Sequence, residues 1–398
     1  MRVGVYLVEL NPAYAGGLTT YAVGLVNGLL DNTRGHEVVL FVSAPGRPLL
    51  TERVRKAATA RFVNVDAPAR GTAELLTALP GLELFHPAVR NRRMAQVAEQ
   101  IAAECDVVLF PLCFMATYRL KVPSIVSFHD LQHETFPQFF NWRSLRARRV
   151  RFGATFRHAS VIQASSVAMK QEALRVYGDR LTPERIAIIP EGVDYAEFAA
   201  PSGDDARARY NLPQEFVFYP AQLWPHKNHL RLLEALHRLR TRDQINIPLV
   251  LTGAEYEAAP AIRAFMERHQ MSDQVFILGR VPYPALRSLY QQASYVISAS
   301  LHESNCLPLL EAAASGAAVI VADIPPNRES ADVFRIRLFD PFDVDNIAAT
   351  LREAWEHRNE NRDAVEFNRQ TIRRFDWSAI GNQYLDQAER LLAGRAQS

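Results

Sequence analysis

Cysteine is scarce in this chain: Cys105, Cys113 and Cys306 are its three cysteines. The number is odd, and the spacing lacks the close pairs that hold a zinc ion. The sequence therefore favours neither a disulfide framework nor a zinc site. Thiols without disulfide partners are typical of a reducing compartment, so we expect a cytoplasmic protein.

Long apolar runs are also missing. No uninterrupted apolar stretch reaches the roughly 18 residues that a membrane-spanning helix needs. The first residues, MRVGVYLVEL, lead directly into a strand pattern without a signal-peptide cleavage site. Net charge is small as well, because 45 Lys and Arg face 43 Asp and Glu, for a net charge of +2. We therefore expect a soluble or peripherally membrane-bound protein with no nucleic-acid partner.

The 398 residues are enough for two domains of about 200 residues each. Strand-length apolar runs alternate with helix-length segments in both halves, which predicts an α/β fold with two doubly wound sheets. We place the boundary in the polar stretch from Asp194 to Asp205. The expected strands are Val3–Val8, His36–Val42, Arg61–Val65, Cys105–Phe110, Ser124–Phe128, Ser160–Ala164 and Arg185–Ile189, then Phe216–Pro220, Pro248–Gly253, Val275–Gly279, Tyr295–Ala299 and Ala318–Asp323.

A glycine pair follows the first expected strand, in the segment AGGLTTY. Gly16 and Gly17 allow the backbone to approach a ligand closely, and Thr19 or Thr20 is a candidate cap for the helix behind them. A tight turn without a ligand is the alternative. No GxGxxG pattern follows this strand, so a dehydrogenase lacks its main sequence support.

A polar cluster ends the strand at Ser124–Phe128, in SFHDLQHETFP. His129, Asp130 and His133 then lie where a strand gives way to a loop, at the carboxyl edge where α/β sheets bind ligands. We favour a functional role over a structural one for this cluster. A metal site would need a third ligand that the spacing does not supply.

Six arginines occur in RSLRARRVRFGATFRH, which is expected to be a helix. The segment from Arg143 to Arg157 is a candidate contact for a membrane surface or an anionic acceptor. The favoured alternative is a solvated helix face whose arginines pair with acids elsewhere.

In the second half, Lys227 lies just before an amphipathic helix pattern, at another junction between strand and helix. A lysine there would answer the charge of a departing diphosphate. Right-handed crossovers would bring the turns after the second-half strands to one edge of the sheet. Those turns are Gln222–Lys227, Gly253–Glu255, Gly279–Pro282, Ser300–Asn305 and Asp323–Asn327.

The stretch SLHESNCLPLLEAAASGAAVIVAD is the most informative one. It predicts a turn, a helix over Leu307–Ser315 closed by Gly316, and a strand. Glu303 falls in the turn, and Glu311 lies eight positions on, about two helical turns further along. The start of a helix at a carboxyl edge suits a phosphate, whereas carboxylates accept hydrogen bonds from sugar or ribose hydroxyls. The pair therefore suggests a nucleotide-sugar.

A pair of aspartates, Asp343 and Asp345, forms a DxD that precedes a helix pattern. Capping explains it better than metal binding. We assign no metal-binding residue anywhere in the chain.

Together these segments resemble the family 4 retaining glycosyltransferases, across almost the whole chain. The most specific part is Glu303, seven residues and Glu311, followed by AAASGAAVIVAD; AGGLTTY, FHDLQH, PEGVD and PHKN support it. The resemblance implies the GT-B fold, in which two Rossmann-like domains face a cleft. Residues 1–198 would bind the acceptor and residues 199–375 the nucleotide-sugar, and residues 376–398 would form a helix returning toward the first domain.

The resemblance also implies residue roles. The catalytic residues would be His129, which contacts the transferred sugar or its acceptor, Lys227, which holds the diphosphate, and Glu303, which holds the sugar hydroxyls. Glu311 would contact the ribose, and the backbone around Arg280 and Val281 the base. The implied donor-binding residues are Gly16, Gly17, Gln222, Arg280, Val281, Ser304, Asn305, Cys306, Leu307 and Glu311; the candidate acceptor-binding residues are Tyr14, Asp130 and His133.

Two departures from the family pattern concern the donor. Many members carry an arginine where this chain has Gln222, so one positive charge on the diphosphate has to come from elsewhere. Many also read Glu-Gly-Phe-Gly-Leu-Pro where this chain has Glu303-Ser304-Asn305-Cys306-Leu307-Pro308, which changes the shape of the sugar pocket.

The implied function is metal-independent, retaining transfer of a sugar from a nucleoside-diphosphate sugar, expected to be a GDP- or UDP-sugar. The acceptor would be a hydroxyl of a glycan, a lipid-linked glycan or a small natural product, and no cofactor is expected. Two alternatives remain open at this point. One is a nucleotide-sugar epimerase of the same fold, and the other is a non-catalytic nucleotide-sugar-binding protein.

Overall fold

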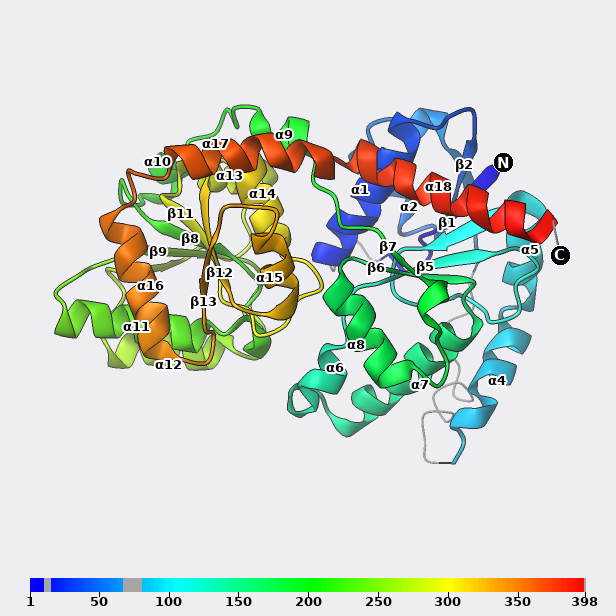
Figure 1. The fold of residues 1–398 in the computed structure, drawn as a ribbon, viewed down its shortest axis with the longest axis horizontal. Helices are drawn as coiled ribbons and strands as arrows, with labels where there is room; N and C mark the ends of the chain where they lie inside the picture. Colours follow the sequence, from blue (N-terminus) through cyan, green and yellow to red (C-terminus); the bar gives the residue numbers. More distant parts are fainter. Residues whose placement is uncertain (11–15, 67–80, 397–398) are drawn as a thin grey trace. The chain divides into compact units, whose positions relative to one another are not determined.

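The computed structural model describes residues 1–10, 16–66 and 81–396 (Figure 1). Tyr14 lies outside the described residues. The chain forms two compact units, one of Met1–Gly192 with Asp376–Ser398 and one of Val193–Phe375. Residues 193–198, which we expected in the first domain, belong to the second, because Phe198 is buried in a core of that unit.

The first unit is built on a parallel seven-stranded sheet in the order β3-β2-β1-β4-β5-β6-β7. Its strands are β1 (Arg2–Tyr6), β2 (Glu37–Val42), β3 (Arg61–Asn64), β4 (Val107–Phe110), β5 (Ser124–Phe128), β6 (Val161–Ala164) and β7 (Ile186–Ile188). Its helices are α1 (Gly17–Asp31), α2 (Arg47–Arg53), α4 (His86–Arg93), α5 (Ala95–Glu104), α6 (Gln132–Thr135), α7 (Trp142–His158), α8 (Val167–Tyr177) and α18 (Trp377–Ala396), with short 3₁₀ turns η2 (Ala57–Thr59), η3 (Glu83–Phe85), η4 (Pro137–Phe139) and η5 (Pro183–Arg185).

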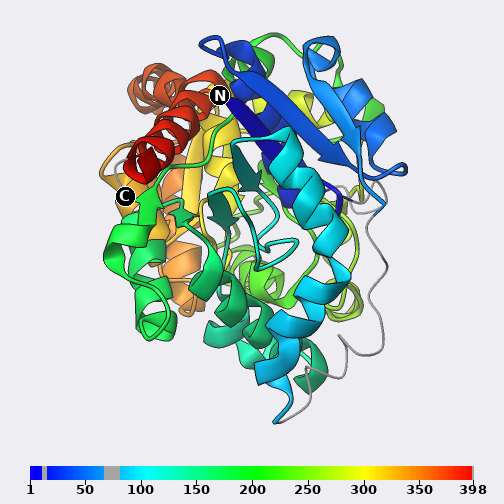
Figure 2. The same ribbon diagram turned by 90° about the vertical axis from the view of Figure 1, so that its right-hand side faces the viewer.

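Alternating strand residues supply two cores, one on each face of this sheet. Val38 and Leu40 face α1, α2 and α18, whereas Val39 and Phe41 face α5, α7 and α8 (Figures 1 and 2). A strand buried on both faces reads as a continuous apolar run, which is why these strands were visible in the sequence.

The C-terminal helix α18 packs closely on α1 because small residues line the contact. A Cβ atom added at Gly24 would lie 2.1 Å from the Trp377 ring, and one added at Gly28 would lie 2.0 Å from the Trp377 carbonyl oxygen. A buried polar network joins the same helices to the sheet: the Tyr21 hydroxyl contacts those of Tyr384 and of Ser127, the latter at 3.0 Å. The last helix is thus part of the first unit's core.

Replacing Gly28 by alanine is expected to destabilise the protein by about 1–3 kcal/mol, because the added methyl group meets a backbone atom that cannot turn aside. The midpoint of urea unfolding measures the effect. Gly394→Ala, later in α18, is the matched control, since an added Cβ there meets nothing within 4 Å. If both variants unfold at the wild-type midpoint, the close approach of the helices is not needed for stability.

The second unit has a parallel six-stranded sheet in the order β10-β9-β8-β11-β12-β13. Its strands are β8 (Val217–Pro220), β9 (Leu249–Thr252), β10 (Val275–Ile277), β11 (Tyr295–Ser298), β12 (Ala318–Ala322) and β13 (Arg337–Phe339). Its helices are α9 (Tyr195–Ala199), α10 (Ala206–Tyr210), α11 (His229–Arg242), α12 (Ala259–Arg268), α13 (Tyr283–Gln292), α14 (Leu307–Ser315), α15 (Pro325–Ala331), α16 (Val344–Glu356) and α17 (Arg362–Thr371), with 3₁₀ turns η6 (Pro225–Lys227) and η7 (Ile372–Phe375).

Local chemistry explains where the decisive helix of this unit begins and ends. Pro308 fits the first turn of α14, where its missing N–H costs nothing, and Gly316 follows the helix with φ +80°, a conformation that favours glycine. The side chain of Asp343 accepts hydrogen bonds from the backbone N–H groups of Asp345 and Asn346. Asp343 of the DxD is therefore the N-cap of α16, as predicted.

Candidate functional site

The second unit has its topological switch point between β8 and β11, where connections leave the sheet in opposite directions. Ligands of such sheets bind outside the carboxyl ends of the strands at this point. Lys227 lies in η6, after β8, and Glu303 in the turn after β11. Their side chains are 20% and 15% exposed, and Nζ lies 2.5 Å from Oε1. The structure thus brings the predicted lysine and glutamate together as an ion pair.

Backbone hydrogen bonds hold the neighbouring turns at the same edge. The Leu301 N–H donates to the His226 carbonyl at 2.8 Å, and the Gly253 N–H donates to the Gly279 carbonyl at 2.8 Å. Because β8 to β12 pair in parallel, the five expected turns do share one edge of the sheet. Several turns can therefore contact one ligand.

The start of α14 provides positive electrostatic potential at this edge. Ser304, Asn305 and Leu307 are half-buried beside it, and the helix dipole favours an anion there. Cys306 differs from the expectation, because its side chain is fully buried and burial raises the pKa of its thiol to about 12. It can contribute to a ligand through its backbone but not through its sulfur.

Glu311 projects from the second turn of α14. Burial raises the pKa of its carboxyl group to about 7, against the opposing effect of a hydrogen bond from the Tyr290 hydroxyl. Tyr290 on α13 is itself buried, so this bond fixes the position of the carboxyl group. Nothing in the sequence pattern pointed to Tyr290 as its partner, because an apolar helix position is an ordinary place for a tyrosine.

Gln222 and Arg280 lie in the turns after β8 and β10, at the same edge of the sheet. The Trp224 Nε1–H donates to Oε1 of Gln222 at 2.9 Å, and the Trp224 ring stacks on Tyr256 with centroids 3.8 Å apart. An indole N–H only donates, so the amide oxygen is taken and the Gln222 NH₂ group remains as a donor. Arg280 is exposed, whereas Val281 is half-buried against the core.

In the first unit, His129 follows β5 at the carboxyl edge and is buried. Its Nε2–H donates to the Pro111 carbonyl at 2.8 Å, and its Nδ1 lies 3.6 Å from Oε1 of Glu191. Burial alone would lower the pKa of His129, but the hydrogen bond and charge of Glu191 outweigh it, and the pKa is raised. The rings of Tyr21 and His129 pack in a T-shaped arrangement, with their centroids 4.5 Å apart. These contacts favour a charged imidazolium in a fixed orientation.

Glu191 is a site residue that the sequence analysis did not single out. It lies in the PEGVD segment after β7, is 3% exposed, and is the counter-charge of His129. The sequence signal available for Glu191 was its place between Pro190 and Gly192, just after a strand.

The other predicted residues of the first unit have different positions. Asp130 accepts a hydrogen bond from the Gln132 N–H at 3.0 Å, next to the short helix α6. His133 is fully buried, and its ring stacks on that of Phe152 with the centroids 4.9 Å apart. Burial lowers the pKa of His133 to about 4. The structure therefore corrects its expected contact with an acceptor, because the ring belongs to the hydrophobic core.

The glycine pair also departs from the expectation in one respect. Gly16 is the N-cap of α1 and Gly17 is its first residue. Thr19 and Thr20 lie inside the first turn, where their N–H groups donate to the Gly16 carbonyl at 2.9 and 3.1 Å, so neither threonine caps the helix.

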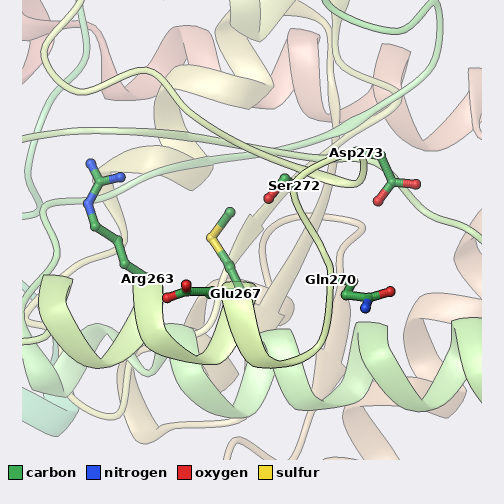
Figure 3. Close-up of a pocket in the computed structure, with 6 residues that line it drawn as sticks. Arg263, Glu267, Gln270, Ser272 and Asp273 are labelled. Carbon is green, nitrogen blue, oxygen red and sulfur yellow. The ribbon is translucent and has the colours of Figure 1, made fainter.

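Two further observations concern other possible ligand sites, one for a metal ion and one in a surface depression. Within residues 1–10, 16–66 and 81–396, no group of three or more His, Cys, Asp or Glu side chains is arranged to hold a metal ion. A surface depression at the amino end of β10, opposite to the edge that holds Lys227, is drawn in Figure 3. It is lined by Arg263, Met266, Glu267, Gln270, Ser272 and Asp273.

Comparison with known proteins gives matches in both units. Residues 204–371 match the family described as Glycosyl transferases group 1, and residues 15–197 match Glycosyltransferase Family 4. The chain is 23% identical over 374 residues to O-antigen chain mannosyltransferase B of Escherichia coli, covering 93% of this chain and 95% of the relative.

A second relative and a solved structure extend this comparison. The chain is 25% identical over 250 residues to the GDP-mannose:cellobiosyl-diphosphopolyprenol alpha-mannosyltransferase of Xanthomonas campestris, covering 61% of this chain and 62% of that one. The structure of Anabaena HepE in complex with UDP and glucose superposes with a TM-score of 0.73 at 18% identity, covering 98% of this chain and all of HepE. At that identity the likeness shows a shared fold.

Proposed function

The chain belongs to the family 4 glycosyltransferases of GT-B fold, and from this premise we propose that it transfers mannose from GDP-mannose to a hydroxyl acceptor, with retention at the anomeric carbon and without a metal ion. The ion pair of Lys227 with Glu303 at the switch point of the second unit carries the proposal. Both relatives are named as mannosyltransferases, which supports the choice of sugar, and the name of the second one includes GDP-mannose, which supports the choice of nucleotide. Neither an epimerase nor a binding protein accounts for these transferase relatives.

Two charges develop during the reaction, and the site has to stabilise both. Positive charge builds at the anomeric carbon while negative charge builds on the departing diphosphate. Fixed positive groups placed where that charge develops stabilise the transition state. Lys227 and the start of α14 supply them, and the NH₂ group of Gln222 adds a neutral donor. Glu303 orients the sugar by accepting hydrogen bonds from its hydroxyls.

Retention follows if the acceptor attacks from the face of the leaving group. The departing diphosphate then accepts the acceptor's proton, and no protein nucleophile is required. An α-configured product, identified by NMR, is expected from the α-linked donor. A covalent glycosyl-enzyme trapped on the reaction path would contradict this route.

The test of the proposed function is a donor screen with the whole chain. Nucleoside-diphosphate sugars that bind the native state raise its melting temperature, and the rise grows with the logarithm of ligand concentration over Kd. We expect the largest shift and the fastest donor consumption with GDP-mannose, compared with UDP-, ADP- and TDP-sugars, and rates unchanged by EDTA. A UDP-sugar preference would refute the donor choice, and no binding by any nucleotide-sugar would refute the proposed function.

The pKa of Glu311 predicts how donor binding depends on pH. Above pH 7 its carboxyl group is ionised and accepts hydrogen bonds from both ribose hydroxyls; below pH 7 it is protonated and its capacity falls. Each pH unit below the pKa costs up to about tenfold in affinity. Nucleotide affinity should therefore fall about tenfold more in the wild type than in Glu311→Gln between pH 8 and pH 6. Parallel pH profiles for the two proteins would show that the ribose is held elsewhere.

The start of α7 has the features of a membrane contact. Trp142, Phe85 and Leu84 are 58%, 59% and 84% exposed, and Arg146 of α7 reaches Glu83 of η3 at 2.8 Å, which places the two segments together. The guanidinium of Arg143 lies over the Trp142 ring. Aromatic and leucine side chains among arginines suit an anionic bilayer surface. In the described residues, no helix is both long enough and apolar enough to span a bilayer.

We therefore expect the chain to bind vesicles of phosphatidylglycerol and phosphatidylcholine more than vesicles of phosphatidylcholine alone, and Trp142→Ala to reduce this binding severalfold in a flotation assay. Phe342→Ala is the matched control, since Phe342 is 57% exposed beneath Arg231 in the second unit. Three arginines of the helix, Arg146, Arg149 and Arg151, do pair with acids. If Trp142→Ala and Phe342→Ala bind vesicles equally, α7 does not contact the membrane and presents only a solvated face.

A further inference from the structure

A fully buried tyrosine contacts the turn that carries Lys227. Tyr219 is the third residue of β8, and its hydroxyl donates a hydrogen bond to the backbone carbonyl of Lys227 at 2.8 Å. The strand β8 lies between β9 and β11 in the middle of the sheet (Figure 1). The hydroxyl therefore links a rigid element of the second unit to the turn η6.

The Tyr219 ring has a fixed place in the core. It stacks on the ring of His229 at the start of α11, with the centroids 4.8 Å apart and the planes at 29°. His229 is itself buried, and burial lowers its pKa to about 3, so the imidazole is neutral. A phenylalanine such as Phe218 would fill this space equally well, whereas a buried phenol hydroxyl costs free energy unless it is hydrogen-bonded. The hydroxyl has its partner in the Lys227 carbonyl.

The backbone around Lys227 is irregular. Lys227 is the last residue of η6, and Asn228 follows with φ +60°, a left-handed conformation that is uncommon for residues other than glycine. A backbone hydrogen bond of α11 reaches back to the Asn228 carbonyl at 3.4 Å, one residue short of Lys227. The Asn228 side chain donates to the Pro341 carbonyl at 2.8 Å. The Tyr219 hydroxyl holds the preceding carbonyl, that of Lys227 itself.

This hydroxyl lies close to the charges of the site. Burial and the charge of Glu303 raise the pKa of Tyr219 well above its ordinary value, so the hydroxyl stays protonated and remains a donor. The Lys227 side chain extends from the held backbone to Glu303, with Nζ 2.5 Å from Oε1. A group that stabilises transition-state charge has to be placed to within a fraction of an ångström. A shift of the Lys227 backbone therefore moves the ammonium group away from its working position.

We propose that Tyr219 is a positioning residue for glycosyl transfer, which holds the Lys227 backbone so that the ammonium group meets the departing diphosphate. The inference rests on the proposed function, because it assigns a further residue to the same site. Tyr219 is fully buried and acts through Lys227 rather than on the donor. This indirect action can be tested apart from the stability that the hydroxyl contributes.

The first test removes the hydroxyl alone. Tyr219→Phe should lower the single-turnover rate at saturating GDP-mannose about tenfold, the scale of one lost hydrogen bond. Tyr295→Phe is the matched control, because Tyr295 is also buried, accepts a hydrogen bond from Asn361 Nδ2 at 2.5 Å, and starts β11 at the opposite edge of the sheet. A purely structural role predicts that both variants lose stability and that neither loses rate while folded. A wild-type rate in Tyr219→Phe would overturn the proposal.

A second set of variants shows whether the effect passes through Lys227. If it does, adding Tyr219→Phe to Lys227→Ala lowers the rate no further, because the ammonium group that the hydroxyl positions is already absent. The same tenfold loss in both backgrounds would overturn the proposal. Tyr219→4-aminophenylalanine carries a weaker donor at the same place, so its rate should lie between those of Tyr219→Phe and the wild type. It replaces Tyr219→Phe in both backgrounds if that variant does not fold.

Nucleotide binding separates this inference from the proposed function. Because Lys227 is assigned to the diphosphate, Tyr219→Phe should weaken GDP binding severalfold and leave GMP binding unchanged in calorimetric titrations. UDP and UMP take their place if the donor screen selects a UDP-sugar. A wild type that binds no nucleotide would refute the proposed function. A wild type that binds GDP, with equal GDP affinity in Tyr219→Phe or with equal losses for GDP and GMP, would overturn only the role of Tyr219.

Discussion

Replacing Lys227 by alanine is expected to lower kcat by about 10²–10³-fold, the usual effect of removing one fixed group that stabilises transition-state charge. Because Gln222 is uncharged, Lys227 has to supply the positive charge in the turn after β8. The measurement is release of nucleoside diphosphate in single turnover at saturating donor. Arg238→Ala is the matched control, because Arg238 lies further along α11 and pairs with Glu234 and Asp345.

Loss of the lysine also leaves Glu303 without its ion-pair partner. Removing one member of a largely buried pair destabilises the folded state, so the melting temperature of Lys227→Ala has to be compared with its activity. A variant that remains folded at the assay temperature yet retains more than a tenth of wild-type kcat would shift the electrostatic role from Lys227 to the start of α14. Gln222→Arg then offers a gain-of-function check, since it adds a second cation beside the lysine.

Local signals in the chain predicted the elements that carry the second unit's candidate site, and the parallel sheet brings Lys227 and Glu303, which are 76 residues apart, to one edge. The bounds of α14 came from Pro308 and Gly316, whose backbone preferences act over one or two residues. The parallel strands were visible because burial on both faces makes them continuously apolar. The strand β13 was missed, since RLF is three residues long with arginine at its start.

The surroundings of the two histidines could not be predicted, because they depend on contacts between segments that are distant in the sequence. His133 and His129 look equivalent in FHDLQH, yet Phe152 of α7 covers one ring and Glu191 holds the other. The partner of each histidine lies about 20 to 60 residues away in sequence, where periodicity carries no information. The ion pairs of Glu9 with Arg90 of α4 and with Arg151 of α7 likewise form only in the fold, because these residues are distant in the sequence.

Replacing Glu303 by glutamine should separate turnover from nucleotide binding more clearly than any other change. The carboxylate accepts hydrogen bonds from sugar hydroxyls that must be held as the anomeric carbon becomes positive, so kcat should fall about 10²-fold or more. A nucleoside diphosphate without sugar does not use this residue. Its affinity should be unchanged or slightly higher, because the substitution releases Lys227 from the 2.5 Å ion pair.

The opposite signs of these two effects make the prediction specific to a sugar-holding role. If Glu303 only kept Lys227 in place, glutamine would weaken nucleotide binding and turnover together. The double variant Lys227→Ala with Glu303→Gln distinguishes the two cases. If Glu303 acts only through Lys227, the double variant should have the same kcat as Lys227→Ala, whereas a sugar-holding Glu303 makes the kcat of the double variant lower than that of either single variant. A double variant with the kcat of Lys227→Ala would contradict the sugar-holding role of Glu303.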